Sequence, residues 1–212
     1  YVERMTRLFS ENFSDQTVDQ ISIRITDKEA KDYATSTYKE DWLKSNPDGY
    51  ALWFAHRCKA DETVKLRAEA IVPVEKYNKK KTVLQRIVQI LKRHRDMMFY
   101  NDTEDKPISI IITTLAARAY NGEQNLLEGL LNVVDNLEKS ITKNEIGEDV
   151  VSNPVNPEEN FADKWPTHPK RRKNFYKWLA AVKKDMHEIL DGANRIQIQI
   201  IMGRVFGKNM IE

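Results

Sequence analysis

Apolar residues recur with a helical period over much of the chain. In 84–99, LQRIVQILKRHRDMMF, they fall on one face at about 3.6 residues per turn, which predicts a helix with one buried side. Similar patterns predict helices over 107–120, 125–141 and 170–190. The residues predicted to be buried in the first two helices are Leu84, Ile87, Val88, Leu91, Met98, Ile108, Ile111, Ile112, Leu115 and Ala119. We therefore expect a mainly α fold.

The rest of the chain has weaker patterns. Alternation in ISIRIT, 21–26, predicts a short half-buried strand, and SNPDGY, 45–50, predicts a turn that is followed by a helical segment. Segment 71–81 is interrupted by a proline and ends in a lysine run, as expected of a solvated helix start. Segment 195–207 fits a last helix or strand.

The segment SNPVNPEENFADKW, 152–165, contains two Asn-Pro steps. Proline fixes φ, cannot donate a backbone hydrogen bond and pushes the preceding residue toward an extended conformation. We expect a rigid, non-helical connector before the helix over 170–190.

Composition limits the class of protein. With 212 residues, 41% hydrophobic and 31% charged, the chain can form a sizeable core, and no apolar run reaches the length of a membrane span. The single cysteine, Cys58, excludes an internal disulfide and favours a reducing compartment, the cytoplasm. One Cys and four scattered His give no zinc spacing. A net charge of +2 means that nucleic-acid binding would need a local basic patch.

The helix over 84–99 carries a continuous polar stripe beside its apolar face, made of Gln85, Gln89, Lys92 and Asp96. Ser109, Thr113 and Tyr120 form a similar flank on the next helix. If the two helices packed antiparallel, Lys92 and Ser109 could point into one cleft, where an ammonium and a hydroxyl would suit a phosphate. The alternative is that both flanks simply face water.

Two further motifs have competing interpretations. HRDMMFYN, 94–101, matches a protein-kinase catalytic loop letter for letter, but it lies in a helix with no glycine-rich loop before it and no Asp-Phe-Gly after it, so we interpret it as coincidental. Arg95 falls on the apolar side of that helix, which predicts a buried partner.

KRRK, 170–173, is interleaved with aromatic residues and could bind nucleic acid, or it could be a solvated helix face whose aromatics Phe175 and Trp178 belong to the core. Positive charge near a helix N-terminus is unfavourable, so we expect an anionic neighbour. The acidic pairs in DETV, NDTED and EDVV are not arranged as a metal site.

Three stretches together resemble a known family: DWLKSNPDGYALWF (41–54), the segment 83–120 and NPVNPEENFADKW (153–165). In order and spacing they are similar to the C-terminal half of bacterial cGAS/DncV-like nucleotidyltransferases, which make cyclic oligonucleotides in antiphage signalling. The fold that this implies is the helical C-terminal lobe of a polymerase-β-like nucleotidyltransferase. The resemblance covers about residues 21–190 and implies a helical lobe in which a lysine and a serine contact the nucleoside triphosphate. By position these are Lys92 and Ser109; Ile110 stands where some relatives have a stacking tyrosine.

The resemblance also implies what lies outside this sequence. The family's Gly-Ser turn and Asp-x-Asp pair, which with a third carboxylate hold Mg²⁺, are missing here. We therefore expect residues 1–50 to connect to a catalytic lobe of the same polypeptide and 51–212 to form a helical nucleotide-binding lobe that is inactive alone. The predicted nucleotide-binding residues are Lys92, Ser109 and Thr113, with no catalytic or metal-binding residue in this chain. The Asn-Pro segment would act as a strap for the last helices.

Two alternatives of other classes remain open. One is a helical protein-binding or scaffold module in which Lys92 and Ser109 are solvated. The other is a nucleic-acid-binding lobe that uses KRRK, whose binding would weaken steeply with salt.

Overall fold

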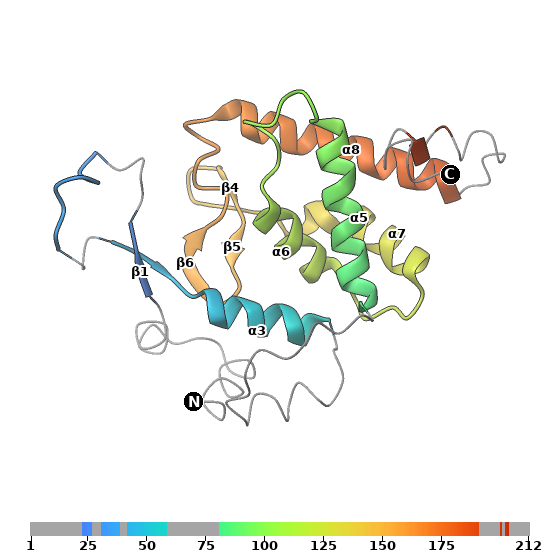
Figure 1. Ribbon diagram of the computed structural model, residues 1–212, viewed down its shortest axis with the longest axis horizontal. Helices are drawn as coiled ribbons and strands as arrows, with labels where there is room; N and C mark the ends of the chain where they lie inside the picture. Colours follow the sequence, from blue (N-terminus) through green and yellow to red (C-terminus); the bar gives the residue numbers. More distant parts are fainter. Residues whose placement is uncertain are drawn as a thin grey trace. The chain divides into compact units, whose positions relative to one another are not determined.

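The computed structural model describes residues 23–26, 31–38, 42–58, 81–190, 200 and 202–203. Its elements cluster into two compact units (Figure 1). Unit 1 contains the first two strands, nearly all of the first described helix and the hairpin of 152–160; unit 2 contains the four long helices that follow residue 81. The predicted mainly α fold is confirmed.

In unit 1, strand β1 (Ile23–Ile25) pairs antiparallel with β2 (Leu43–Ser45). The prediction of a strand here is confirmed, but the prediction that it is half-buried is wrong, because Ile23 and Ile25 are 52% and 38% exposed. Alternating apolar side chains place one face of a strand on the same side, but that face is buried only where another layer of the structure packs against it.

Helix α3 (Pro47–Arg57) begins where the sequence predicted a turn. Asn46 is 2% exposed, and its side-chain Oδ1 accepts a hydrogen bond from the Gly49 N–H at 2.9 Å. Asparagine before the first turn and proline in the first helical position are both favourable for starting a helix. The prediction of a turn at 45–50 was therefore wrong, because the same residues cap a helix.

The Asn-Pro segment forms a hairpin of β5 (Ser152–Asn153) and β6 (Asn156–Asn160), which confirms that it is not helical. The Asn153 side chain accepts from the Val155 N–H at 3.0 Å and donates to Glu159 at 2.7 Å. Besides its partner β5, strand β6 also contacts β2 of the same unit. The role of this segment as a strap stays a prediction.

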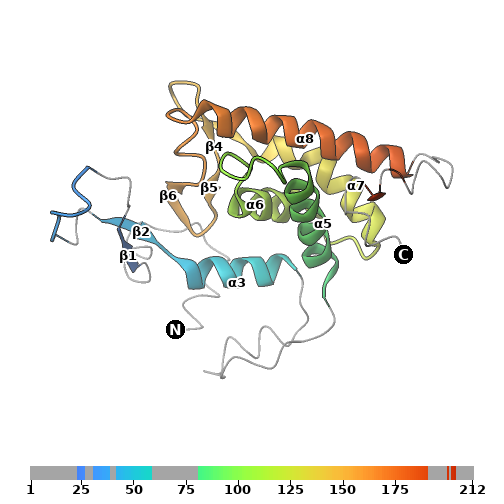
Figure 2. The same cartoon turned by 45° about the horizontal axis from the view of Figure 1, so that its top comes forward.

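Unit 2 is built from α5 (Val83–Met98), α6 (Ser109–Ala119), α7 (Leu126–Asn136) and α8 (Pro169–Leu190). Helix α5 packs against the other three, and α7 also packs against α8 (Figures 1 and 2). All four predicted helices are present. The predicted helix over 125–141 ends earlier than expected, because its last turn is the 3₁₀ helix η2 (Leu137–Ser140).

The core of unit 2 consists largely of the residues that the apolar stripes predicted. Those that are fully or almost fully buried include Leu84, Ile87, Val88, Leu91, Ile111, Ile112, Leu115 and Ala119. Two predictions were wrong. Ile108 is 46% exposed because it is the residue before the first turn of α6, and Met98, the last residue of α5, is only half-buried.

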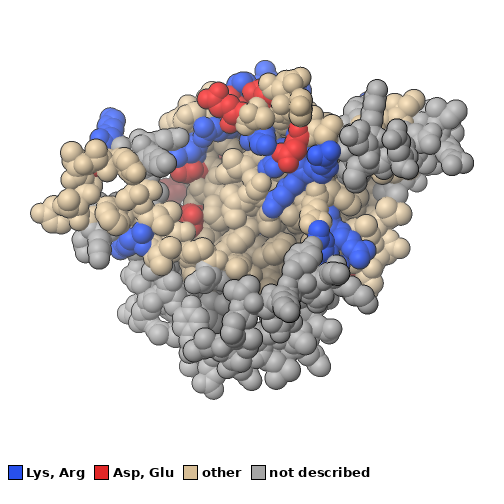
Figure 3. Space-filling view, viewed as in Figure 1, with Lys and Arg blue, Asp and Glu red and all other residues tan. Residues whose placement is uncertain are grey.

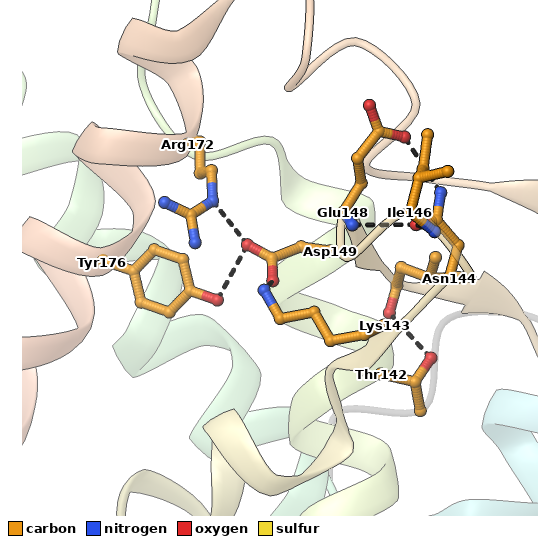
Figure 4. A network of polar contacts seen from close by, with 9 residues as sticks. Thr142, Lys143, Asn144, Ile146, Glu148, Asp149, Arg172 and Tyr176 are labelled. Carbon is orange, nitrogen blue, oxygen red and sulfur yellow. Dashed lines mark hydrogen bonds and ion pairs between the residues drawn. The ribbon is translucent and has the colours of Figure 1, made fainter.

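A short hairpin of β3 (Thr142–Lys143) and β4 (Asp149–Val150) is joined to α8 by the buried carboxylate of Asp149. This carboxylate accepts hydrogen bonds from Lys143, from Arg172 at 2.6 Å and from the Tyr176 hydroxyl at 3.0 Å (Figure 4). One acidic residue therefore ties the hairpin to the N-terminal half of α8.

Helix α5 begins with a reciprocal cap. The Thr82 hydroxyl accepts from the Gln85 N–H, and the Gln85 side chain accepts from the Thr82 N–H. We expect Thr82→Ala to lower the free energy of unfolding by about 1 kcal/mol, because it leaves a helix donor unpaired. Urea unfolding followed by circular dichroism measures the change. Thr82→Ser keeps the hydroxyl and should be close to wild type; equal losses in both variants would contradict the role of the cap.

Some predictions fall outside the described residues. These are the segment 71–80 and most of 195–207. The proposed division into 1–50 and 51–212 stays a prediction. In the described part of the chain, no helix is both long and apolar enough to cross a membrane.

Candidate functional site

A cluster of charged and polar side chains lies where the end of α5 meets the start of α6. Its centre is Arg95, which is only 5% exposed. Arg95 Nη1 donates to the Pro107 carbonyl and to the Ser109 hydroxyl oxygen, both at 2.9 Å. The predicted buried partner of Arg95 is therefore confirmed.

Two more charged residues complete this cluster. Asp96 accepts from Arg95 Nε at 3.0 Å and from Lys106 Nζ at 2.8 Å. Lys92 lies one turn before Arg95 on α5. We call Lys92, Arg95, Asp96, Lys106 and Ser109 the basic cluster; its three cations and one carboxylate give a net charge of +2.

Lys92 is half-buried at the edge of this cluster. Burial lowers the pKa of its ammonium, and the positive charge of Arg95 lowers that pKa further, whereas Asp96 acts in the opposite direction. Both causes of the lowered pKa destabilise the charged form, and both would be relieved by a bound anion. Lys92 is therefore suited to gain from contact with a phosphate.

Ser109 is exposed and is the first residue of α6. Among the described helices, α3, α5 and α7 have a capping side chain on their first turn, whereas the Ile108 side chain offers none to α6. The first turn of α6 itself contains no acidic residue. Backbone N–H groups and the positive end of the helix dipole thus lie beside the Ser109 hydroxyl, an arrangement that favours anions.

The other two polar residues of α6 behave differently. Thr113 is buried and donates its hydroxyl proton to the Ser109 carbonyl at 2.8 Å, so only its oxygen lone pairs could serve a ligand. The Tyr120 hydroxyl donates to the Glu123 carbonyl at 2.5 Å at the opposite end of the helix. The structure joins Ser109 and Thr113 but does not bring Tyr120 to them.

The packing that brings α5 close to Ser109 differs from the antiparallel helix pair that we considered from the sequence. Helix α6 runs across α5 at a steep angle instead of antiparallel to it (Figures 1 and 2). Arg95 makes the connection, with Lys106 and Pro107 from the intervening loop. The sequence signalled Arg95 by its place on the apolar side, but it did not reveal the residues that Arg95 contacts.

The KRRK segment at the start of α8 is paired with acidic residues of the same chain. Lys170 lies 3.0 Å from Asp105, and Arg172 lies 2.6 Å from Asp149. Acidic and basic side chains also lie next to one another near the top of the face in Figure 3. The predicted anionic neighbour is confirmed, and these internal carboxylates compete with any nucleic acid for the patch.

Phe175 and Trp178 beside KRRK are core residues, both 0% exposed, in agreement with the interpretation of KRRK as a solvated helix face. The kinase-like HRD sequence is helical, as expected. Its histidine, His94, is buried and contacts the Asp185 carboxylate of α8 at 3.1 Å.

Acidic, histidine and cysteine side chains are dispersed over the described residues. No group of three or more His, Cys, Asp or Glu in the described ranges is placed to hold a metal ion. The residues present there do not fit a Mg²⁺ site.

Comparison with known proteins gives two informative similarities. The chain is 33% identical over 181 residues to the c-di-GMP synthase of Roseivirga ehrenbergii, a match that covers 82% of this chain and 47% of that protein. Its fold is similar to that of the Bradyrhizobium diazoefficiens CD-NTase CdnG, solved in complex with GTP. That match has a TM-score of 0.57 and 20% sequence identity, and covers 80% of this chain and 54% of CdnG. No protein-family model matches the chain.

These similarities confirm the resemblance that the sequence indicated: the chain is similar in sequence to a c-di-GMP synthase and in fold to a CD-NTase. The chain spans about half the length of the two relatives. The activity, substrates and partners of a whole protein therefore belong to the proposal that follows.

Proposed function

We propose that this chain is part of a nucleotidyltransferase that makes cyclic dinucleotides, and that Lys92 and Ser109 of its basic cluster bind the phosphates of a nucleoside triphosphate. The observation that carries the proposal is the arrangement around Ser109. The exposed residue Ser109 stands at the uncapped start of α6, and Arg95 links its hydroxyl to the helix that carries the half-buried Lys92.

The roles follow from the chemistry of each group. The Lys92 ammonium supplies a compact positive charge, and the Ser109 hydroxyl and the first N–H groups of α6 supply donors. Thr113 can only accept at this position, which makes it a weaker candidate for contact with phosphate oxygens. In the whole enzyme, a ribose hydroxyl would attack an α-phosphorus and expel pyrophosphate, while this cluster holds the donor nucleotide.

Mg²⁺ would be held by a catalytic lobe of the same polypeptide, and antiphage signalling in the cytoplasm is the setting that the family suggests. ATP and GTP are the nucleotides to test first, since the related CdnG was solved with GTP. A scaffold module without a nucleotide site is the competing function, and it predicts that the wild-type chain binds neither ATP nor GTP.

The first test is binding of GTP and ATP by isothermal titration calorimetry. We expect Lys92→Ala to weaken triphosphate binding about tenfold to a hundredfold, because a charge-assisted hydrogen bond contributes about 1.5–3 kcal/mol. The midpoint of thermal unfolding should stay near that of wild type, since Lys92 is not part of the fully buried core.

Lys177→Ala, which removes an exposed lysine from α8, is the matched control and should bind like wild type. Equal affinities of the Lys92→Ala and Lys177→Ala variants would contradict the assignment. Absence of binding by the wild-type chain would favour the scaffold function.

A further inference from the structure

Arg95 is placed to control how Ser109 presents its hydroxyl group. Arg95 is 5% exposed, and its guanidinium is held at several points, by Asp96 as well as by the Pro107 carbonyl. Its Nη1 atom donates to Pro107 and to Ser109 at the same distance, 2.9 Å. A planar group fixed in this way has little freedom to move away from Ser109.

The direction of the Arg95–Ser109 hydrogen bond determines what the serine can do. An arginine has no acceptor, so the Ser109 oxygen must accept and its own proton must point elsewhere. The Ser109 carbonyl accepts a hydrogen bond from the Thr113 hydroxyl one turn later in α6, which fixes the backbone of Ser109. The hydroxyl proton is therefore left to donate to a group other than Arg95.

We propose that Arg95 is a positioning residue that fixes the Ser109 hydroxyl as an outward donor to the phosphate chain of a nucleotide. This inference rests on the proposed function of the basic cluster. In this role, Arg95 does not contact the ligand. It holds the Ser109 hydroxyl, which does. The ordering of Ser109 is then completed before the nucleotide arrives, which reduces the entropic cost of binding.

The test is a double-mutant cycle on the whole chain with inorganic tripolyphosphate as the probe, because this ligand reports phosphate recognition without a base. The variants are Arg95→Lys, Ser109→Ala and the combination, and both dissociation constant and thermal midpoint are measured. Lysine keeps the charge but lacks the planar fork whose other nitrogens bind Asp96 and so fix Nη1 between Pro107 and Ser109. We expect Arg95→Lys to weaken binding about fivefold in the wild-type background.

In the Ser109→Ala background, the same change should weaken binding by less than about twofold, because the group that Arg95 positions is already missing. The thermal midpoint should still fall in both backgrounds, since the bond to Pro107 is lost in each. An arginine with a structural role alone would change affinity and thermal midpoint alike in both backgrounds. Arg86→Lys, a change of an exposed arginine on the same helix, should leave binding unchanged.

Equal weakening by Arg95→Lys in both backgrounds would overturn the positioning role while leaving the proposed function intact. Absence of tripolyphosphate and GTP binding by the wild-type chain would overturn the proposed function and, with it, this inference. If Arg95→Lys does not fold, Arg95→Gln, which keeps a neutral donor, takes its place in the same cycle with the same expected outcomes.

Discussion

Phe175→Ala is expected to lower the free energy of unfolding by about 3–5 kcal/mol, the range seen when a fully buried aromatic side chain is removed from a core. Phe175 is 0% exposed in α8. Its ring centroid lies 5.1 Å from that of Trp165 and 5.8 Å from that of Trp178, and it meets Tyr176 edge-on at 5.5 Å. The substitution removes a shared partner from three aromatic contacts and leaves a cavity.

Urea unfolding followed by circular dichroism at 222 nm, a helix signal chosen because unit 2 is mainly helical, measures this loss. Phe175→Leu keeps most of the volume and should cost less than about 1.5 kcal/mol. Tyr100→Ala is the matched aromatic control; Tyr100 is 76% exposed, so the change should stay within about 0.5 kcal/mol. A Phe175→Ala variant as stable as the Tyr100→Ala variant would show that α8 does not depend on this aromatic group.

The sequence predicted the central parts of the helices much better than their ends. The stripe of Leu84, Ile87 and Leu91 repeats with the period of the helix itself, so burial follows directly from the pattern. The positions and the burial of helix ends depend on capping and on the residues that pack over them. Ile108 continues the apolar pattern but stands before the first turn, and Asn46 resembles a turn residue until its side chain is seen to cap α3.

Contacts between distant segments were only partly predictable. The unfavourable charge of KRRK at a helix start indicated an anionic neighbour. It did not identify Asp149 or Asp105, which lie in other segments of unit 2 and are brought close only by folding. Sequence spacing carries no information about such pairs unless they share one helix or hairpin.

The candidate site shows the same limit. Lys92 and Ser109 were selected by a polar flank and a family resemblance, and Arg95 by its position on the apolar side. The Arg95–Ser109 bond spans the whole loop between α5 and α6, and the path of that loop determines whether the bond can form. Geometry, and not residue type alone, makes Arg95 part of the site.

Asp149→Asn is the second change for which we expect a large effect, a loss of about 2–4 kcal/mol in the free energy of unfolding at pH 7. The Asp149 side chain is 0% exposed and receives three hydrogen bonds, from Lys143, Arg172 and Tyr176 (Figure 4). An amide keeps one acceptor and places an NH₂ group among these donors. The loss should not reach the upper range for buried ion pairs, because Lys143 and Arg172 are half-exposed and can be rehydrated.

Urea unfolding at pH 7 compares this variant with wild type and with Asp163→Asn, which changes an exposed carboxylate of unit 2. The control should differ from wild type by less than about 0.5 kcal/mol. Equal stabilities of the Asp149→Asn and Asp163→Asn variants would mean that the network does not hold the β3–β4 hairpin to α8.

The same network predicts how stability depends on pH. Burial by itself would raise the pKa of the Asp149 carboxyl, but the hydrogen bonds from Lys143, Arg172 and Tyr176 outweigh it and hold that pKa below its usual range. The unfolded chain, with a carboxyl pKa of about 3.9, therefore takes up the proton first as the pH falls. The contribution of Asp149 is complete above that value and is lost as the pH falls through the folded pKa. The gap in stability between wild type and Asp149→Asn should therefore narrow below about pH 4.

Tyr176 should produce the opposite dependence at high pH. Burial, together with its hydrogen bond to Asp149, raises the pKa of the Tyr176 hydroxyl to about 12. Its contribution is present below the unfolded pKa of about 10 and is lost as the pH rises toward 12. Tyr176→Phe should remove this alkaline dependence while it leaves the acid limb, since Lys143 and Arg172 still donate to Asp149. An alkaline limb as large in Tyr176→Phe as in wild type would assign it to other groups, such as Tyr120 and Cys58, whose pKa values burial also raises.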